Sequence, residues 1–268
     1  MVRVGIDAGG TFTDFVVAGE DGSIESFKIR SNPQAPARVI LEGLDRAAGG
    51  VSREVIHGST VATNALLERK GARTAFLTTE GFEDLVHIGR QNRQRLYDLT
   101  PELRRPLVER ADCHGVRERT YYDGNVARNP SPAGLRRLRA KLRRDGVSSI
   151  AICLLHAYQN SENERAVAAA LEGLGYLCCS HDVSPEFREY ERASTTVINA
   201  YVGPLMDAYL SELESVGGPA TSILQSNGGF MTTSEARRYP VRTVLSGPAG
   251  GVVGAAELAR ASGVRRIL

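Results

Sequence analysis

The chain opens with an alternation of apolar and polar residues that is typical of β-strands. Apolar side chains stand two residues apart over 2–6, and a second β-rich run covers 12–17 after a pair of glycines. A third strand is predicted over 24–29. The spacing of apolar residues then predicts a helix over 36–48, which a further Gly-Gly pair ends. The opening segment therefore predicts three antiparallel strands followed by a helix.

Strands and helices alternate in the next segment. A short strand is predicted over 55–57, and a hydroxyl of Ser59 or Thr60 can cap the helix that follows it. Gly71 ends this helix ahead of a strand over 74–78. A strand, a helix and a second strand in this order predict a mixed sheet with helical crossovers.

Periodicity fades after residue 80 and returns near residue 132. The fading segment is rich in Arg, Pro and Gly and carries a small β element near 119–122. The first helix after it, over 136–144, is strongly basic, and we interpret its charges as a solvated surface. The other elements predicted in this block are strands over 149–155, 176–180 and 222–225, helices over 162–174, 190–216 and 247–261, and the beginning of a strand at 265.

Composition and charge exclude several classes of protein. With 268 residues, 42% of them hydrophobic, the chain can bury the core of one large domain or two lobes. A net charge of +2 without a basic, aromatic-interleaved stripe predicts no nucleic-acid partner. The longest apolar stretch, near 150–155, is too short to cross a membrane, and no export signal opens the chain. The four cysteines show no C-x-x-C spacing, so we expect them to be reduced and the protein to be cytoplasmic.

The first glycine pair is the strongest candidate for chemistry. Backbone N–H groups of Gly9, Gly10 and Thr11 can converge on a phosphate oxygen, as in other anion-binding turns. Asp7, where the first strand ends, would then lie close enough to hold Mg²⁺. An ordinary hairpin with a Gly-Gly turn needs no ligand and would look the same.

Two further groups of polar residues follow predicted elements. His57, Thr60, Thr63 and Asn64 stand at the end of one strand and the start of the next helix, where α/β sheets bind ligands. The alternative is that a hydroxyl only caps the helix and the histidine is structural. In a separate loop Arg90, Gln91 and Asn92 have the side chains to hydrogen-bond a carboxylate or an amide, although solvated loop residues look the same.

Five separated motifs together resemble the hydantoinase A and 5-oxoprolinase family. They lie at 7–14, 57–71, 89–93, 225–229 and 245–254, so the match is spread over nearly the whole chain. The resemblance implies the ribonuclease H-like (actin-like ATPase) α/β fold, a mixed sheet with flanking helices, together with a second, smaller α/β region. Sugar kinases and heat-shock chaperones share this fold.

The resemblance also implies a domain order and two cofactors. We expect a phosphate-hairpin lobe over 1–79, an inserted or second α/β region over 80–185, and over 186–268 the start of the hydantoinase A domain. Family members carry a second phosphate hairpin that would follow residue 268, so we expect a piece of a larger subunit that is inactive alone. ATP and Mg²⁺ are the implied cofactors.

The implied activity is ATP-dependent hydrolysis of a cyclic amide whose carbonyl is first phosphorylated. A hydantoinase B-type partner and an oligomer of the full-length protein are implied as well. Alternatives are an ATP-dependent ketone carboxylase of the acetone or acetophenone type and a non-catalytic ATP-binding module. The residues expected to act are Asp7 and Asp14 in catalysis, Asp7 as metal ligand, Gly9, Gly10, Thr11 and Thr13 at the phosphates, and His57, Thr60, Thr63, Asn64, Arg90, Gln91 and Asn92 at the substrate.

Overall fold

The computed structural model contains two compact units. Unit 1 comprises Met1–Lys70 and Leu205–Leu268, and unit 2 comprises Gly71–Pro204. The structure describes residues 2–32, 35–48, 53–92, 97, 99–100, 105–217 and 221–267.

Unit 1 is built on a six-stranded mixed sheet with the order β12-β11-β4-β1-β2-β3. The first three strands are antiparallel, which confirms the predicted hairpin and third strand. Two further strands, β4 and β11, run parallel to β1 and so bring their carboxyl ends to one edge. The strands are β1 (Val2–Ala8), β2 (Phe12–Ala18), β3 (Ile24–Arg30), β4 (Arg53–Ser59), β11 (Thr221–Leu224) and β12 (Phe230–Thr232).

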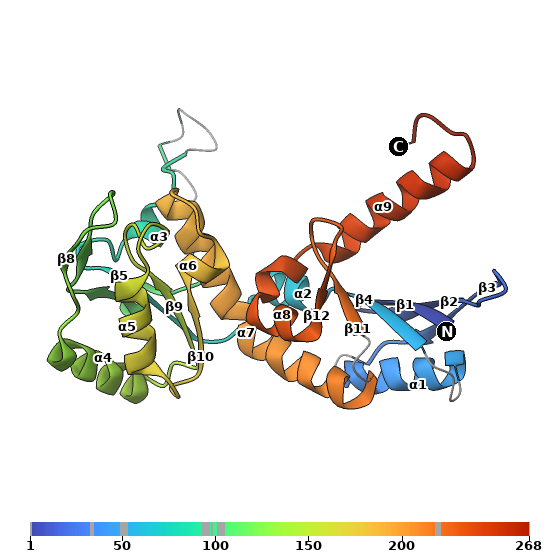
Figure 1. The fold of residues 1–268 in the computed structure, drawn as a ribbon, viewed down its shortest axis with the longest axis horizontal. Coiled ribbons are helices and arrows are strands. Elements are labelled where there is room, and N and C mark those ends of the chain that lie inside the picture. The colour runs from blue at the N-terminus through green and yellow to red at the C-terminus, as the bar shows by residue number, and fades with distance from the viewer. Residues whose placement is uncertain are drawn as a thin grey trace. The chain divides into compact units, whose positions relative to one another are not determined.

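Different helices pack on the two faces of this sheet. Helix α1 (Pro36–Ala48) packs on the face that buries Val4 and Phe15, where a Cβ on Gly43 would lie 2.0 Å from the Phe15 ring. A glycine at this position therefore lets the helix approach the sheet closely. The opposite face receives the start of α9 (Ser246–Ala261), and Figure 1 shows α1 and α9 on opposite sides of the sheet.

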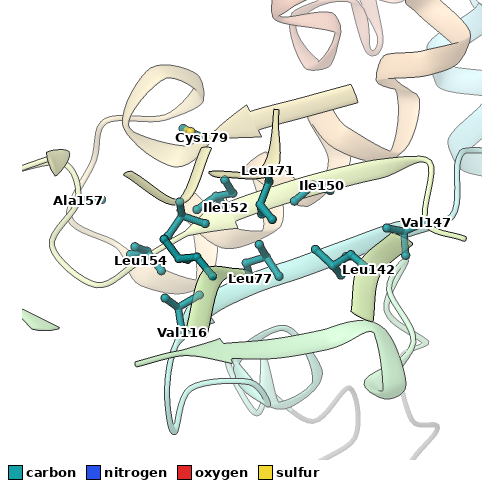
Figure 2. Close-up of a cluster of buried hydrophobic side chains, with 13 residues drawn as sticks. Leu77, Val116, Leu142, Val147, Ile150, Ile152, Leu154, Ala157, Leu171 and Cys179 are labelled. Carbon is teal, nitrogen blue, oxygen red and sulfur yellow. The ribbon is translucent and has the colours of Figure 1, made fainter. Parts of the chain in front are cut away.

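Unit 2 contains a four-stranded, fully parallel sheet with the order β10-β9-β5-β6. Helices α4 and α5 cover one face, and the buried apolar cluster between them and the sheet is drawn in Figure 2. The long helix α7 lies on the other face, because the Ser149 hydroxyl of β9 donates to the Ala200 carbonyl at 2.6 Å. The elements are β5 (Thr74–Thr79), β6 (Cys113–Val116), β9 (Ser149–Cys153), β10 (Tyr176–Cys179), α4 (Pro132–Asp145), α5 (Glu162–Leu171) and α7 (Glu189–Gly217).

Most of the predicted elements are confirmed, one is wrong, and several observed elements were not predicted. Residues 264–267 form no strand, so the predicted strand at 265 is wrong for the part that the structure describes. The remaining elements are α2 (Val61–Leu67), α3 (Leu85–Ile88), α6 (Ser180–Val183), α8 (Thr233–Arg238), β7 (Arg119–Thr120), β8 (Val126–Arg128) and two short 3-10 turns, Arg110–Asp112 and Pro240–Thr243. The sequence did not reveal α3 and β6 in the fading segment, nor α6, β12 and α8 elsewhere.

The boundaries of the two units differ from those expected over 1–79, 80–185 and 186–268. Strand β5 pairs with β6 and β9, and so it lies in unit 2 rather than with the opening hairpin. Helix α7 supplies residues to both units. Among the described helices, none combines the length and the apolar character needed to cross a bilayer.

Candidate functional site

The Gly-Gly turn between β1 and β2 is closed on one side and open on the other. The Gly9 N–H donates to the Phe12 carbonyl at 3.1 Å, and a Cβ on Gly9 would lie 2.9 Å from that oxygen. Around Gly10, by contrast, a Cβ would meet nothing within 4 Å. Within the described part of the chain, the N–H groups of Gly10 and Thr11 have no hydrogen-bond acceptor. Two of the three predicted donors are therefore free, while Gly9 shapes the turn.

Ser31, just beyond β3, fixes this turn. Its N–H donates to the Thr11 carbonyl at 3.0 Å and its hydroxyl to the Gly9 carbonyl at 2.7 Å. The Thr13 hydroxyl lies 3.0 Å from the Ser31 hydroxyl, and Thr13 is only 2% exposed. Thr13 therefore supports the turn from the buried side, and Ser31 is a contributor that the sequence reading missed.

We expect alanine at the two glycines to have opposite effects. Gly9→Ala places a methyl group against the Phe12 carbonyl and should lower the thermal midpoint by several degrees, on the order of 1–3 kcal/mol. Gly10→Ala meets no atom and should leave the midpoint unchanged while it obstructs an anion at the open side. Circular dichroism melts and a calorimetric titration with Mg-ADP of the full-length variants check both. An equal loss of stability in the two variants would contradict this account of the turn.

Asp7 and Asp14 face each other across β1 and β2, and both are exposed. Partial burial, and next the charge of Asp14, raise the pKa of Asp7 above its ordinary value. On the other side of Asp7 lies Gly58 of β4, whose missing Cβ would stand 3.6 Å from the Asp7 carboxylate. The Asp14 carboxylate is 3.1 Å from the Lys28 ammonium. An exposed pair of carboxylates is an arrangement that can hold a divalent cation.

The starts of two helices meet at the same edge of the sheet. The Thr60 hydroxyl donates to the Ala8 carbonyl at 3.1 Å and accepts from the Asn64 amide at 3.3 Å. The Thr63 hydroxyl accepts from the N–H of Leu245, a residue in the left-handed conformation (φ 62°) directly before α9. These polar groups lie at the carboxyl ends of β1 and β4, as predicted. The hydroxyl of Thr60 makes no cap bond to its own helix but joins that helix to β1.

His57 does not belong to this group. It is completely buried, and its Nε2 lies 2.6 Å from the Tyr209 hydroxyl of α7. Its register partner on β1 is Ile6, and neighbouring positions on a strand point to opposite faces, so His57 and Asp7 are on different faces of the sheet. His57 is therefore a core residue in this structure and cannot contact a ligand beside Asp7.

Burial also lowers the pKa of His57 to about 4. The unfolded chain takes up a proton near pH 6.5 and the folded chain does not, so stability should fall as the pH drops from about 6.5 to about 4. In wild type the folding stability lost over this pH range should approach about 3 kcal/mol. The variant His57→Gln keeps a polar partner for Tyr209 but has no imidazole to protonate, so it should lack this contribution. Urea titrations at several pH values measure both slopes. Identical slopes would show that His57 titrates normally.

The Arg-Gln-Asn loop belongs to unit 2 and is exposed. Arg90 forms an ion pair with Glu191 at the start of α7, and Gln91 has a positive φ of 55°. Asn92 follows it in the open. Arg93, the last residue of this motif, lies outside the described residues. These side chains are accessible to a ligand of unit 2.

The sequence reading missed a buried ionic network at the carboxyl edge of the unit 2 sheet. Glu164 is 0% exposed and accepts four hydrogen bonds, from Leu154 N–H, the Ser180 hydroxyl, and the N–H and Nδ1 of His181. Arg192, also 0% exposed, donates to the same Ser180 hydroxyl. The sequence indicated this network only by the charged residues that lie between strands and helices in its second alternating segment.

This network contains a group of atoms with metal-ligand spacing. Donor atoms of Glu164, Cys179 and His181 lie within 4.8 Å of one another. Burial, however, raises the pKa of the Cys179 thiol, whereas a metal ligand must be a thiolate. The Glu164 oxygens already accept hydrogen bonds, and the Arg192 guanidinium lies 4.0 Å away. The arrangement is that of an internal ionic network.

Comparison with known proteins gives close relatives. The α subunit of caprolactamase from Pseudomonas jessenii is 33% identical over 99% of this chain and 41% of its own length. The 5-oxoprolinase of Saccharomyces cerevisiae is 31% identical over 94% of this chain and 23% of its own length. The nucleotide-free structure of acetone carboxylase, an enzyme of ATP-dependent acetone carboxylation, matches 97% of this chain with a TM-score of 0.86 and 28% identity.

Two family models divide the chain between them. The model of the hydantoinase/oxoprolinase N-terminal region matches residues 3–175, and the hydantoinase/oxoprolinase model matches residues 192–268. The chain spans less than half the length of the relatives and of the solved protein that it matches. The mixed sheet of unit 1, the parallel sheet of unit 2 and the flanking helices agree with the predicted actin-like ATPase type of α/β fold. The chain therefore belongs to the hydantoinase/oxoprolinase family.

Proposed function

We propose that this chain is the nucleotide-binding part of an ATP-dependent enzyme subunit that hydrolyses a cyclic amide. The observation that carries the proposal is the open turn at Gly10 and Thr11 with Asp7 beside it on the exposed face of the sheet. The names of two relatives, caprolactamase and 5-oxoprolinase, support the choice of a cyclic amide. Since the chain covers only part of each relative, this activity is proposed for the whole protein.

The residues at the turn fit a magnesium nucleotide. Free N–H groups at Gly10 and Thr11 suit phosphate oxygens, and the space around Gly10 admits them. Asp7 carries a raised pKa because it is partly buried and faces Asp14, so its ionised form gains from a nearby cation. We assign Mg²⁺ to Asp7 and the phosphates to the two N–H groups.

Cyclic amides resist hydrolysis because their carbonyl carbon is a poor electrophile. Mg-ATP, when bound, would supply a phosphoryl group to the carbonyl oxygen with ADP as the leaving group, and this would make the carbonyl carbon a better electrophile for water. The protein's part is to position the reactants and to neutralise charge. The Gly10 and Thr11 N–H groups orient the phosphates, and Thr13 and Ser31 hold the turn that presents them.

We assign the other predicted site residues to contacts with the nucleophile or the substrate. We assign Asp14 to orienting a nucleophile or the metal's waters, since its carboxylate faces Asp7. Thr60, Thr63 and Asn64 are assigned to the substrate side of the site at the carboxyl ends of β1 and β4. In unit 2, Arg90, Gln91 and Asn92 present exposed donors for an amide or carboxylate.

The partners and the location are part of the same proposal. The relatives include enzyme subunits, which supports a separate or fused partner of the hydantoinase B type and an oligomeric complete enzyme. The four cysteines are free and buried, which is typical of proteins in a reducing compartment, so we propose the cytoplasm.

A second candidate is an ATP-dependent ketone carboxylase, which the similarity to acetone carboxylase favours. The test is phosphate release from Mg-ATP by the full-length protein with its partner subunit, in the presence of hydantoin, 5-oxoproline, or acetophenone with bicarbonate. Stimulation by a cyclic amide is the expected result. Stimulation by the ketone alone would favour the carboxylase, and release that ignores every substrate would leave a non-catalytic ATP-binding module.

A further inference from the structure

A row of charged side chains crosses the exposed face of β1, β2 and β3. Asp7 pairs in register with Asp14, and Asp14 pairs with Lys28. Residues paired across neighbouring strands point to the same face, so the three side chains form one line. On the same face Asp7 pairs in register with Gly58 of β4, which has no side chain.

The Lys28 side chain is directed toward the open turn. Its Nζ lies 3.1 Å from an Asp14 carboxylate oxygen and 5.6 Å from the centre of the Phe12 ring. Phe12 is the first residue of β2 after the turn, so an ammonium above its ring leans toward Gly10 and Thr11 rather than away from them. Lys28 is therefore the cation of this row, and its ammonium lies on the side of Asp14 toward the turn.

Stability does not explain this position. The Lys28 and Asp14 side chains are 62% and 50% exposed, and ion pairs this open to water contribute little to folding. Two carboxylates opposite each other on adjacent strands are unfavourable, and one lysine neutralises only one of them. The row of Asp7, Asp14 and Lys28 suits a ligand that brings a cation for the carboxylates and negative charge for the ammonium.

We propose that Lys28 is a phosphate-contacting residue: it is held by Asp14 in the free protein and binds the phosphate tail of a nucleoside polyphosphate at the turn. The inference rests on the proposed function, because it requires that a nucleotide binds there. The ammonium is a compact charge on a flexible stem, so it can move from a carboxylate to a phosphate oxygen without a change in the backbone.

The test compares Lys28→Met with Lys28→Arg and with Arg3→Met in the full-length protein. Arg3 is a matched control, because it lies on the same face of β1 and forms an exposed ion pair with Glu54. Calorimetric titration with Mg-ADP at low and moderate salt should show about tenfold weaker binding and a weaker salt dependence for Lys28→Met. Lys28→Arg should recover most of the affinity, Arg3→Met should match wild type, and all melting midpoints should agree.

Two results would overturn this inference alone, and a third would overturn the proposed function together with it. If wild type binds Mg-ADP and Lys28→Met binds equally well, the lysine does not contact phosphate, while the proposed function stands. If the Met and Arg variants lose affinity together with melting temperature, Lys28 is structural and the inference is again wrong. If wild type itself fails to bind Mg-ADP, the proposed function is wrong and the inference goes with it.

Discussion

Asp7→Asn should reduce substrate-stimulated phosphate release by the full-length protein at least about 100-fold, without lowering the stability of the ligand-free protein. The amide is neutral and therefore a weaker ligand for Mg²⁺ than a carboxylate, so the affinity for Mg-ADP should fall as well. Stability should be kept because burial and the charge of Asp14 disfavour the ionised form of Asp7. Calorimetry, the release assay and thermal melts measure the three effects.

The pH dependence of this variant follows from the raised pKa of Asp7. The folded state binds a proton more tightly than the unfolded state, so wild type should gain stability as the pH falls through the raised pKa, and Asp7→Asn should lack that gain. Asp21→Asn, in the exposed turn before β3, is the control and should keep full activity. Full activity of Asp7→Asn would show that the carboxylate takes no part in the mechanism. A large loss of stability would show that its role is structural.

Arg192→Met should be the most destabilising substitution considered for unit 2, with a cost of about 3–5 kcal/mol. The change leaves Glu164 as a fully buried carboxylate without its nearby cation and removes the donors to Ser180 and to the Leu154 carbonyl. An uncompensated buried charge is far more costly than the loss of an exposed ion pair. Urea unfolding of the full-length protein, followed by circular dichroism, measures the change.

Two further variants make this prediction specific. Arg188→Met removes an exposed arginine just before α7 and should change stability by no more than about 0.5 kcal/mol. The double variant with Glu164→Met and Arg192→Met should cost less than the sum of the two single changes, because it removes both charges together. A cost for Arg192→Met as small as that for Arg188→Met would show that the network adds nothing to folding.

The local pattern of the sequence was sufficient to predict the hairpin and most helices and strands. The alternation over 2–6 and 12–17 became β1 and β2, and the basic helix over 136–144 lies within α4. Such patterns are informative because one face of each element is buried and the other is not. The open Gly10 was also predictable, since a glycine pair between two strands marks a turn.

Contacts between distant segments were not predictable in the same way. Ser31 closes the Gly9–Thr13 turn from the end of the third strand, and this depends on the register between strands. His57 was expected at the site because it ends a strand, yet a shift of one residue decides which face a side chain occupies. The Glu164 and Arg192 network joins residues from two helices that only the folded unit brings together.

The domain boundaries show the same limit. Strand β5 follows the first helical crossover directly, so the sequence favoured its membership in the opening lobe. In the structure it forms the parallel pairs of unit 2 instead. Which sheet a buried strand joins depends on its partners, and a single run of apolar residues does not identify them.

The most direct test of the account is a crystal structure of the full-length protein with Mg-ADP. We expect the diphosphate to accept hydrogen bonds from the N–H groups of Gly10 and Thr11, with Mg²⁺ beside the Asp7 carboxylate. A nucleotide bound at another place in the protein, with this turn unchanged and its N–H groups facing water, would contradict the central claim.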